Sequence, residues 1–187
     1  MPQGQITQSS MSPRIGLIDY SMGNLHSVRQ AFNRLERPIQ TVSKPLDLQN
    51  CDALILPGVG AFDPAMEHLK STKLIPDIQA WAKDGKPLLG ICLGLQLLFE
   101  SSDEGNKPGL GLLKGHIKHL PKNQGERIPH MGWALLKAKR NCPLLHKEDS
   151  SNWMYFVHSY SAVTENQMDL AATTDFGNST ITAIVWK

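Results

Sequence analysis

The sequence predicts an α/β fold: a three-layer sandwich with a mostly parallel central sheet and an antiparallel extension. Apolar runs that suit strands alternate with helical patterns over the first half of the chain, which is the order of a doubly wound sheet. After Glu100, short strand-like runs follow one another with little helix between them, which favours an antiparallel layer. We find no internal repeat and no linker, so we expect one domain over residues 14–187 after a disordered tail, residues 1–13.

Each element of the first half rests on its apolar spacing. Strands appear as short apolar runs, and helices as apolar residues three or four positions apart. Asn24 is a plausible helix cap, and Asp63 before Pro64 resembles a cap followed by proline in the first helical turn. In chain order we expect strands at 14–19, 39–42, 53–56 and 88–91, and helices at 25–35, 64–70, 74–83 and 93–100.

The second half shows strand-like runs separated by polar turns. Residues 101–109 are polar and turn-rich, and 137–152 are charged and irregular, typical of a surface loop with a short helical turn. The expected strands lie at 110–120, 128–133, 153–163, 169–174 and 181–186.

Composition excludes several classes of protein. The chain has 187 residues and a formal charge of +2, too balanced to indicate a nucleic-acid or membrane surface. No apolar run approaches the roughly 20 residues that span a bilayer. The 3 cysteines form no C-x-x-C pair, so neither a disulfide framework nor a metal site is indicated. We expect a cytoplasmic protein with no metal and no cofactor.

The stretch 86–100 contains the strongest candidate for chemistry. An apolar run passes into a helical pattern within one or two residues, and Cys92 lies at that turn between Gly90 and Gly94. This is the pattern of a nucleophile elbow, in which a strained turn requires small neighbours. We expect the start of the helix to favour the thiolate, and the Leu93 amide to face a developing oxyanion. The alternative is a small buried cysteine that only fills space.

A second glycine pattern, Pro57-Gly-Val-Gly-Ala-Phe62, directly follows a predicted strand. Glycines at positions 58 and 60 permit unusual backbone angles and expose amides at the carboxyl edge of the sheet, where α/β proteins bind ligands. A dinucleotide-binding fingerprint requires a third glycine that opens a helix, and that glycine is missing here. The loop is therefore a candidate ligand-binding site rather than a dinucleotide site.

Together these stretches resemble a known family. The broad pattern Gly-x-Cys-x-Gly resembles the class I (triad-type) glutamine amidotransferases, whose fold is flavodoxin-like. More specific stretches resemble the glutaminase subunits of imidazole glycerol phosphate synthase, which serve histidine biosynthesis. These stretches are Asp19-Tyr-Ser-Met-Gly-Asn-Leu25, Pro57-Gly-Val-Gly60, Pro129-His-Met-Gly-Trp133 and Tyr155-Phe-Val-His-Ser-Tyr160. The similarity covers residues 14–187.

The resemblance implies a mechanism. Cys92 would attack the side-chain amide of glutamine, release ammonia and leave a thioester that water hydrolyses. The amides of Gly60 and Leu93 would form the oxyanion hole after a peptide flip near Val59. Residues implied to contact the substrate are Gly58, Val59, Gln96, Glu104, Ser159 and Tyr160. Taken alone, Gln96 could be a solvated helix residue and Glu104 a surface charge.

The resemblance also implies a partner. Members of this family dock on a cyclase subunit that is a (β/α)8 barrel, to which they pass ammonia within a heterodimer. The matching positions here are Asn24, Met131, Gly132 and Trp133. Met131 and Trp133 could instead belong to the core. Ala134 departs from the family, which usually has a polar residue there, and this departure places one interface contact in doubt.

The largest departure is the catalytic base. Family members carry His-Pro-Glu after the last core strand, whereas this sequence reaches Lys187 without that strand or motif, so we expect the domain to lack both. His146-Lys147-Glu148 lies in a charged loop and is a poor substitute, and His158 suits a structural or pocket role better. Alternatives are a non-catalytic subunit that only binds the cyclase, or another class I amidotransferase, as in anthranilate or pyridoxal phosphate synthesis.

Overall fold

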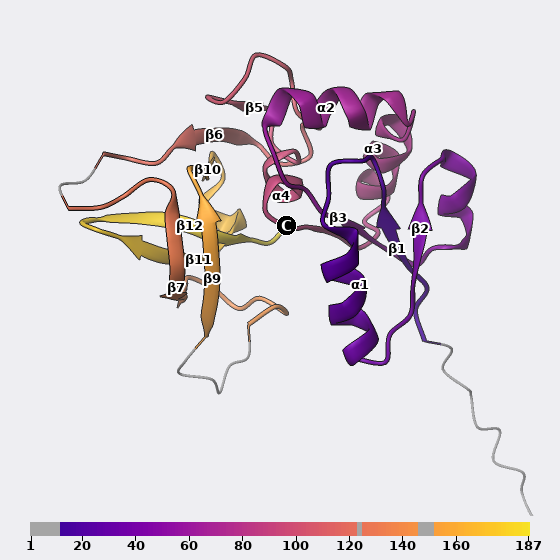
Figure 1. Ribbon diagram of the computed structural model, residues 1–187, viewed down its shortest axis with the longest axis horizontal. Helices are drawn as coiled ribbons and strands as arrows, with labels where there is room; N and C mark the ends of the chain where they lie inside the picture. Colours follow the sequence, from indigo (N-terminus) through magenta and orange to yellow (C-terminus); the bar gives the residue numbers. More distant parts are fainter. Residues whose placement is uncertain (1–11, 123–124, 146–151) are drawn as a thin grey trace, which may run out of the picture.

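The computed structural model describes residues 12–122, 125–145 and 152–187, so the predicted tail is described only at residues 12 and 13, and His146-Lys147-Glu148 lies outside the described residues. A four-stranded parallel sheet forms the centre (Figure 1). Its strand order is β2-β1-β3-β4. The strands are β1 (Ile15–Ile18), β2 (Ile39–Val42), β3 (Ala53–Leu56) and β4 (Leu88–Gly90).

Helices lie on both sides of this sheet. Figure 1 shows α1 on one side and α2 and α3 on the other. This follows from the strand order, because the chain leaves β1 toward β2 and leaves β3 in the opposite direction, and crossovers are right-handed. The helices are α1 (Leu25–Arg34), α2 (Phe62–Ser71) and α3 (Ile75–Lys83), and a 3-10 helix, η1, spans Pro45–Asn50.

The strand order creates a switch point between β1 and β3. Loops that follow neighbouring strands wound in opposite directions diverge there, and ligands bind in the resulting crevice. The loop after β1, residues 19–24, and the loop after β3, residues 57–61, therefore lie at the ligand-binding edge. The next strand, β4, leads directly to Cys92.

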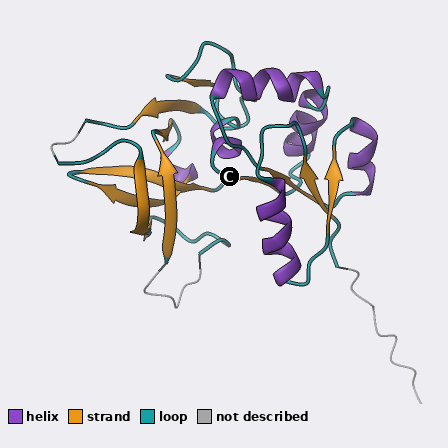
Figure 2. Cartoon of the chain, in the orientation of Figure 1, coloured by secondary structure: helices purple, strands orange, loops and turns teal. Residues whose placement is uncertain are grey.

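The second half of the chain is largely strand (Figure 2). Strand β6 pairs with β5 and β10, β11 pairs with β8 and β12, and β7 pairs with β9. All these pairings are antiparallel except that of β5 with β6. The bounds are β5 (Ser101–Ser102), β6 (Gly115–His119), β7 (His130–Leu135), β8 (Lys137–Ala138), β9 (Trp153–His158), β10 (Tyr160–Thr164), β11 (Leu170–Phe176) and β12 (Ser179–Val185), with a 3-10 helix, η2, at Gln167–Asp169. The predicted fold class is confirmed.

The helix after Cys92 is shorter than predicted. It is α4 (Leu93–Gln96), and the segment 97–100 forms turns instead of continuing the helix. The cause is tertiary: the N–H groups of Gly109, Leu110 and Leu112 donate to the carbonyls of Glu100, Leu97 and Leu98. The carbonyls at the end of the expected helix thus have partners from a distant segment.

Asp63 is not the helix cap. Helix α2 already includes Asp63, and its cap position is Ala61, which makes no side-chain bond. The Asp63 carboxylate instead accepts hydrogen bonds from the amides of Asn106 and Lys107, at 3.0 and 2.9 Å. Glu104 reaches across to accept the Phe62 N–H at 2.9 Å. A carboxylate from another loop therefore satisfies the start of α2.

Other boundaries also differ from the prediction. Strand β6 occupies only the end of the expected 110–120 run, and the expected 153–163 strand is divided at Ser159 into β9 and β10. Part of the expected 137–152 loop forms β8, which pairs with β11. Strand β4 is half-buried rather than buried, because it stands at the end of the described sheet.

Within the described ranges, no helix has the length and apolar character needed to cross a membrane.

Candidate active site

Cys92 lies in the strained turn that the sequence predicts. Its backbone has φ 55° and ψ −118°, a region that residues with a side chain rarely adopt. The turn is held on both sides: Ile91 N–H donates to Leu56 O at 3.0 Å, and Gly94 N–H donates to Ile91 O at 2.9 Å. Strain of this kind, maintained by surrounding hydrogen bonds, projects the side chain out of the turn.

The flanking glycines are sterically required. A Cβ on Gly94 would lie 2.7 Å from the carbonyl carbon of Leu56, and one on Gly90 would lie 2.7 Å from Leu95 Cα. These neighbours are main-chain atoms of paired elements, which cannot rotate away as a side chain could. Positions 90 and 94 must therefore be glycine, because β3, β4 and α4 are in close contact there.

Cys92 is accessible, but the described residues around it do not lower the pKa of its thiol. The residue is exposed, so a substrate can reach it. Protein atoms close to the sulfur nevertheless raise the pKa of its thiol above the ordinary value, and the Leu93 N–H opposes this only in part. The expected effect of the helix start is present in the Leu93 N–H, which favours the thiolate, but desolvation of the sulfur outweighs it. The thiol must lose its proton to a base.

The glycine loop lies against the elbow. A Cβ on Gly58 would be 2.7 Å from Gly94 N and 2.9 Å from Leu93 Cβ. Val59 N–H donates to Met22 O at 2.8 Å, so this amide is occupied by the loop after β1. Gly60 is exposed, has φ 111° and, within the described residues, donates its N–H to no acceptor. Of the two predicted amide sources, Leu93 therefore lies against the loop at Gly58, and Gly60 follows at the exposed end of the same loop.

Of the remaining residues predicted to contact the substrate, two are joined by a hydrogen bond and the others are bonded elsewhere. Gln96 Nε2 donates to Tyr160 O at 3.3 Å, which joins α4 to the start of β10. Glu104 lies at the start of α2, just after the glycine loop, through its bond to Phe62 N–H. Ser159 lies at the junction of β9 and β10, where its carbonyl accepts Leu120 N–H at 2.8 Å. No hydrogen bond joins Ser159 to Gln96 or Glu104.

Strands β7 and β9 carry an exposed apolar surface. Met131 and Trp133 are 62% and 68% exposed, so the alternative that they belong to the core is wrong. Register places three apolar pairs on one side of the two strands, and the Trp133 and Tyr155 rings lie 5.7 Å apart. We call this set the β7–β9 face: Met131, Trp133, Leu135, Trp153, Tyr155 and Val157. Sequence reasoning missed four of these residues, although the alternation of Trp153, Tyr155 and Val157 was a usable signal.

The other predicted interface residues occupy different settings. Gly132 pairs with the buried Phe156 on the opposite side of β7, with φ 138° and open space where a Cβ would be. Asn24 is exposed and caps α1, its side chain accepting Ser27 N–H at 3.1 Å. The predicted capping role of Asn24 is confirmed.

His158 is joined to a second histidine rather than to Cys92. Its Nδ1 lies 2.8 Å from Tyr160 O, and its Nε2 lies 3.2 Å from His130 Nδ1. Burial lowers the pKa of both imidazoles below the ordinary value, and His130 lowers the pKa of His158 further. Across the described ranges no histidine or carboxylate is hydrogen-bonded to Cys92 Sγ, so the base is not among these contacts.

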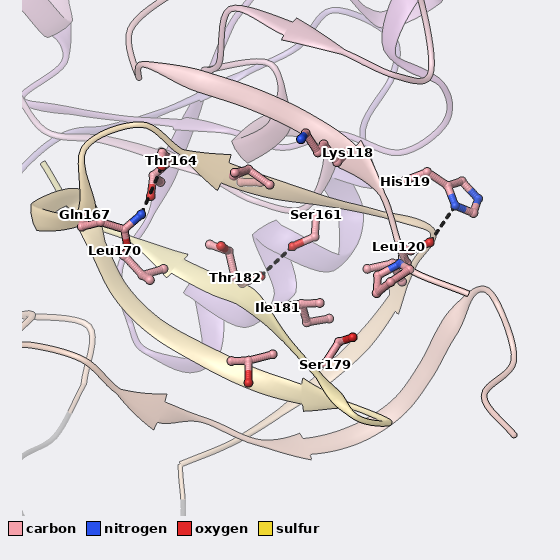
Figure 3. Close-up of a pocket in the computed structure, with 14 residues that line it drawn as sticks. Lys118, His119, Leu120, Ser161, Thr164, Gln167, Leu170, Ser179, Ile181 and Thr182 are labelled. Carbon is pink, nitrogen blue, oxygen red and sulfur yellow. Dashed lines mark hydrogen bonds between the residues drawn. The ribbon is translucent and has the colours of Figure 1, made fainter. Parts of the chain in front are cut away.

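Two further features of the structure bear on ligand binding. In the part of the chain that it describes, no group of three or more His, Cys, Asp or Glu residues is arranged to hold a metal ion. A cavity of about 410 Å³ lies among β6, β10 and β12, where Ser161 Oγ donates to Thr182 O at 3.3 Å (Figure 3). Its walls include neither the elbow nor the glycine loop, so it is separate from the Cys92 site.

A cysteine elbow facing a glycine loop, on a doubly wound sheet with an antiparallel extension, defines a class of enzyme that works through a thioester. Residues 16–187 match the family described as glutamine amidotransferase class-I, and the chain belongs to that family. Among its relatives is the imidazole glycerol phosphate synthase subunit HisH 2 of Prochlorococcus marinus (strain MIT 9313). It is 67% identical over 177 residues, or 95% of this chain and 83% of the relative.

Further relatives carry the same name. Imidazole glycerol phosphate synthase subunit HisH of Synechococcus sp. (strain CC9605) is 57% identical, again over 95% of this chain and 83% of the relative. Solved structures agree on the fold alone. A crystal structure of a glutamine amidotransferase has a TM-score of 0.67 and 17% identity, covering 91% of this chain and 88% of that one. PurLQS from Thermotoga maritima has a TM-score of 0.63 and 23% identity, covering 90% of this chain and 78% of that one.

Proposed function

We propose that this chain is the glutaminase subunit of an imidazole glycerol phosphate synthase. In this role it hydrolyses glutamine to glutamate and ammonia and passes the ammonia to a cyclase subunit, which makes imidazole glycerol phosphate and an aminoimidazole carboxamide ribotide. The observation that carries the proposal is the exposed Cys92 at positive φ, directly beside the Gly58 to Gly60 loop. Relatives named as this subunit, between 52% and 67% identical, support it.

The geometry suits a two-step acyl transfer. A base removes the Cys92 proton, and the sulfur attacks the side-chain carbonyl of glutamine, whose oxygen becomes negative. Amides of Leu93 and Gly60 stabilise that oxyanion, the base gives its proton to the amide nitrogen, which leaves as ammonia, and the glutamyl thioester remains. Water then attacks the thioester to release glutamate and restore the thiol. Because the thiol pKa is raised, the base is essential, and by resemblance it is a histidine held by a glutamate.

We propose that the loop rearranges during activation. Val59 N–H is occupied by Met22 O, and Gly60 has a backbone conformation that glycine adopts readily. Rotation of the peptide between them would direct an amide toward the substrate oxygen. Further substrate contacts would come from Gly58, Val59, Gln96, Glu104, Ser159 and Tyr160.

We propose that the β7–β9 face docks on the cyclase, a (β/α)8 barrel, to form a heterodimer, and that Gly132 and Asn24 also take part in this interface. Apolar side chains in register on two strands resemble the dry centre of a protein interface, in which tryptophan, tyrosine and methionine are enriched.

We place the heterodimer in the cytoplasm, because the free cysteines Cys51, Cys92 and Cys142 suit a reducing compartment. We also take residues 14–187 as a single amidotransferase domain.

Replacing Cys92 with alanine tests this function. The complete gene product, bound to its cyclase, is expected to release ammonia from glutamine, and the C92A variant is expected to lose at least roughly a thousandfold in rate, because the nucleophile is gone. Ammonia release is measured with and without the cyclase, and the C51A variant serves as the control because Cys51 is buried beneath β1 and far from the elbow in sequence. Equal release by wild type and C92A would contradict the proposal.

One observation favours a second function. The described part of the chain presents no hydrogen-bonded base to Cys92, which would suit a subunit that binds the cyclase without hydrolysing glutamine. In that case wild type and C92A would form the same heterodimer and neither would release ammonia.

A further inference from the structure

Tyr20 occupies a position beneath the active-site loop that the mechanism above does not use. It follows β1 directly and is only 2% exposed. Its hydroxyl donates a hydrogen bond of 2.8 Å to the carbonyl of Pro57. Burial raises the pKa of Tyr20 well above its ordinary range, with a further contribution from nearby Cys92. The hydroxyl therefore stays protonated and remains a donor, beneath the loop that lies against the elbow at Leu93 and Gly94.

The glycine loop has a buried part, which this hydrogen bond holds, and an exposed part. Pro57 and Gly58 are buried, and a Cβ on Gly58 would lie 2.6 Å from the Tyr20 hydroxyl. Val59 and Gly60 are exposed, and a Cβ on Gly60 would meet only the flexible end of Met22 within 4 Å. One half of the loop is thus enclosed by main-chain and aromatic atoms, and the other half has room to turn.

We propose that Tyr20 is a positioning residue for glutamine hydrolysis: its hydroxyl fixes the Pro57 carbonyl, so that loop rearrangement is confined to Val59 and Gly60. The inference rests on the proposed function, because it concerns the oxyanion amides of that reaction. An oxyanion forms only as the carbonyl is attacked, so correct placement of Gly60 N–H stabilises the transition state more than the bound substrate. Loss of the anchor should then lower kcat and leave KM for glutamine nearly unchanged.

The Tyr20→Phe variant tests the anchor, because it removes the hydroxyl and keeps the ring. The complete gene product bound to its cyclase is assayed for ammonia release. We expect kcat to fall about tenfold, since one hydrogen bond is lost and a buried carbonyl is left unpaired, while KM changes by less than about twofold. Alkylation of Cys92 by iodoacetamide forms no oxyanion, so its rate should change by less than about twofold.

Ser71→Ala is the matched control. Ser71 Oγ also donates to a carbonyl, that of His68 at 2.7 Å, but at the exposed end of α2. We expect its kcat, KM and alkylation rate to match wild type.

The outcomes separate the inference from the function on which it rests. An unchanged kcat in Y20F, or equal losses of kcat and Cys92 alkylation, would overturn the positioning role. Alkylation of the buried Cys51 and Cys142 in Y20F would also overturn it, because Tyr20 would then support the fold as a whole. If wild type and C92A release ammonia equally, the proposed function itself fails, whatever Y20F does.

Discussion

Replacing Gly94 with alanine is expected to destabilise the protein and to slow glutamine hydrolysis by roughly 100-fold. The added Cβ would overlap the main chain of Leu56, lying 2.7 Å from its carbonyl carbon and 3.0 Å from that of Pro57. Strand β3 cannot retreat, because Leu56 pairs with Gly90 and Leu54 with Leu88. Overpacking of this kind costs about 1 to 3 kcal/mol or more, and displacement of a reacting group by about 1 Å lowers the rate by roughly 100-fold.

Chemical denaturation measures the free energy of unfolding of G94A, and ammonia release by the complex measures its activity. Gly85→Ala is the control for replacing a glycine. Gly85 has φ 72° and open space around the position of a Cβ, so its cost is backbone strain of about 1 to 2 kcal/mol, with activity retained. If G94A proved as active as G85A, the close contact between α4 and β3 would not exist.

Truncating Trp133 to alanine is expected to weaken cyclase binding strongly. Trp133 is the most exposed side chain of the β7–β9 face, and it is flanked by Tyr155 with its ring in edge contact at 5.7 Å. Tryptophans at the centre of an interface contribute about 2 to 4 kcal/mol, so Kd should rise by roughly 100-fold. Because Trp133 lies on the surface of the free subunit, its unfolding free energy should change little.

Calorimetric titration with the purified cyclase measures the change in Kd. Leu46→Ala is the control, because Leu46 is 61% exposed on η1, outside the β7–β9 face, and we expect it to bind as wild type does. Equal affinities for W133A and L46A would place the cyclase on another surface.

Much of this fold could be predicted from local patterns. Strand β3 begins and ends where its apolar run does, since a buried parallel strand requires a continuous apolar stretch. Strand β2 also has the predicted bounds, although it lies at the edge of the sheet and exposes Gln40 and Thr41. The elbow was predictable because a chain that turns directly from strand into helix at Cys92 needs a glycine on each side of that residue. Its strained angles and the required glycines are local consequences of that turn.

What the sequence did not reveal depends on contacts between distant segments. The end of α4 is set by amides of 109–112, which no helical period can indicate. Glu104, rather than the predicted Asp63, accepts a hydrogen bond at the start of α2, and each of these carboxylates binds amides about forty residues away. The raised pKa of Cys92 likewise comes from the atoms gathered around its sulfur, which a pattern of residue types does not reveal.

The roles of the candidate substrate residues stay predictions. Gln96 and Tyr160 are joined by a hydrogen bond, whereas Ser159 is bonded to Leu120 and Glu104 to Phe62 rather than to another substrate candidate. The register of β7 and β9 adds Tyr155 and Val157 to a surface for which the motif indicated only part of one strand.

The most direct test of a cysteine nucleophile at this elbow is to trap the acyl intermediate. The complete gene product, bound to the cyclase, is mixed with glutamine, quenched in acid during turnover, digested and weighed by mass spectrometry. We predict a glutamyl group on the peptide that contains Cys92 and none on those containing Cys51 or Cys142. Turnover with an unmodified Cys92 peptide, or an acyl group on either of the other cysteines, would contradict it.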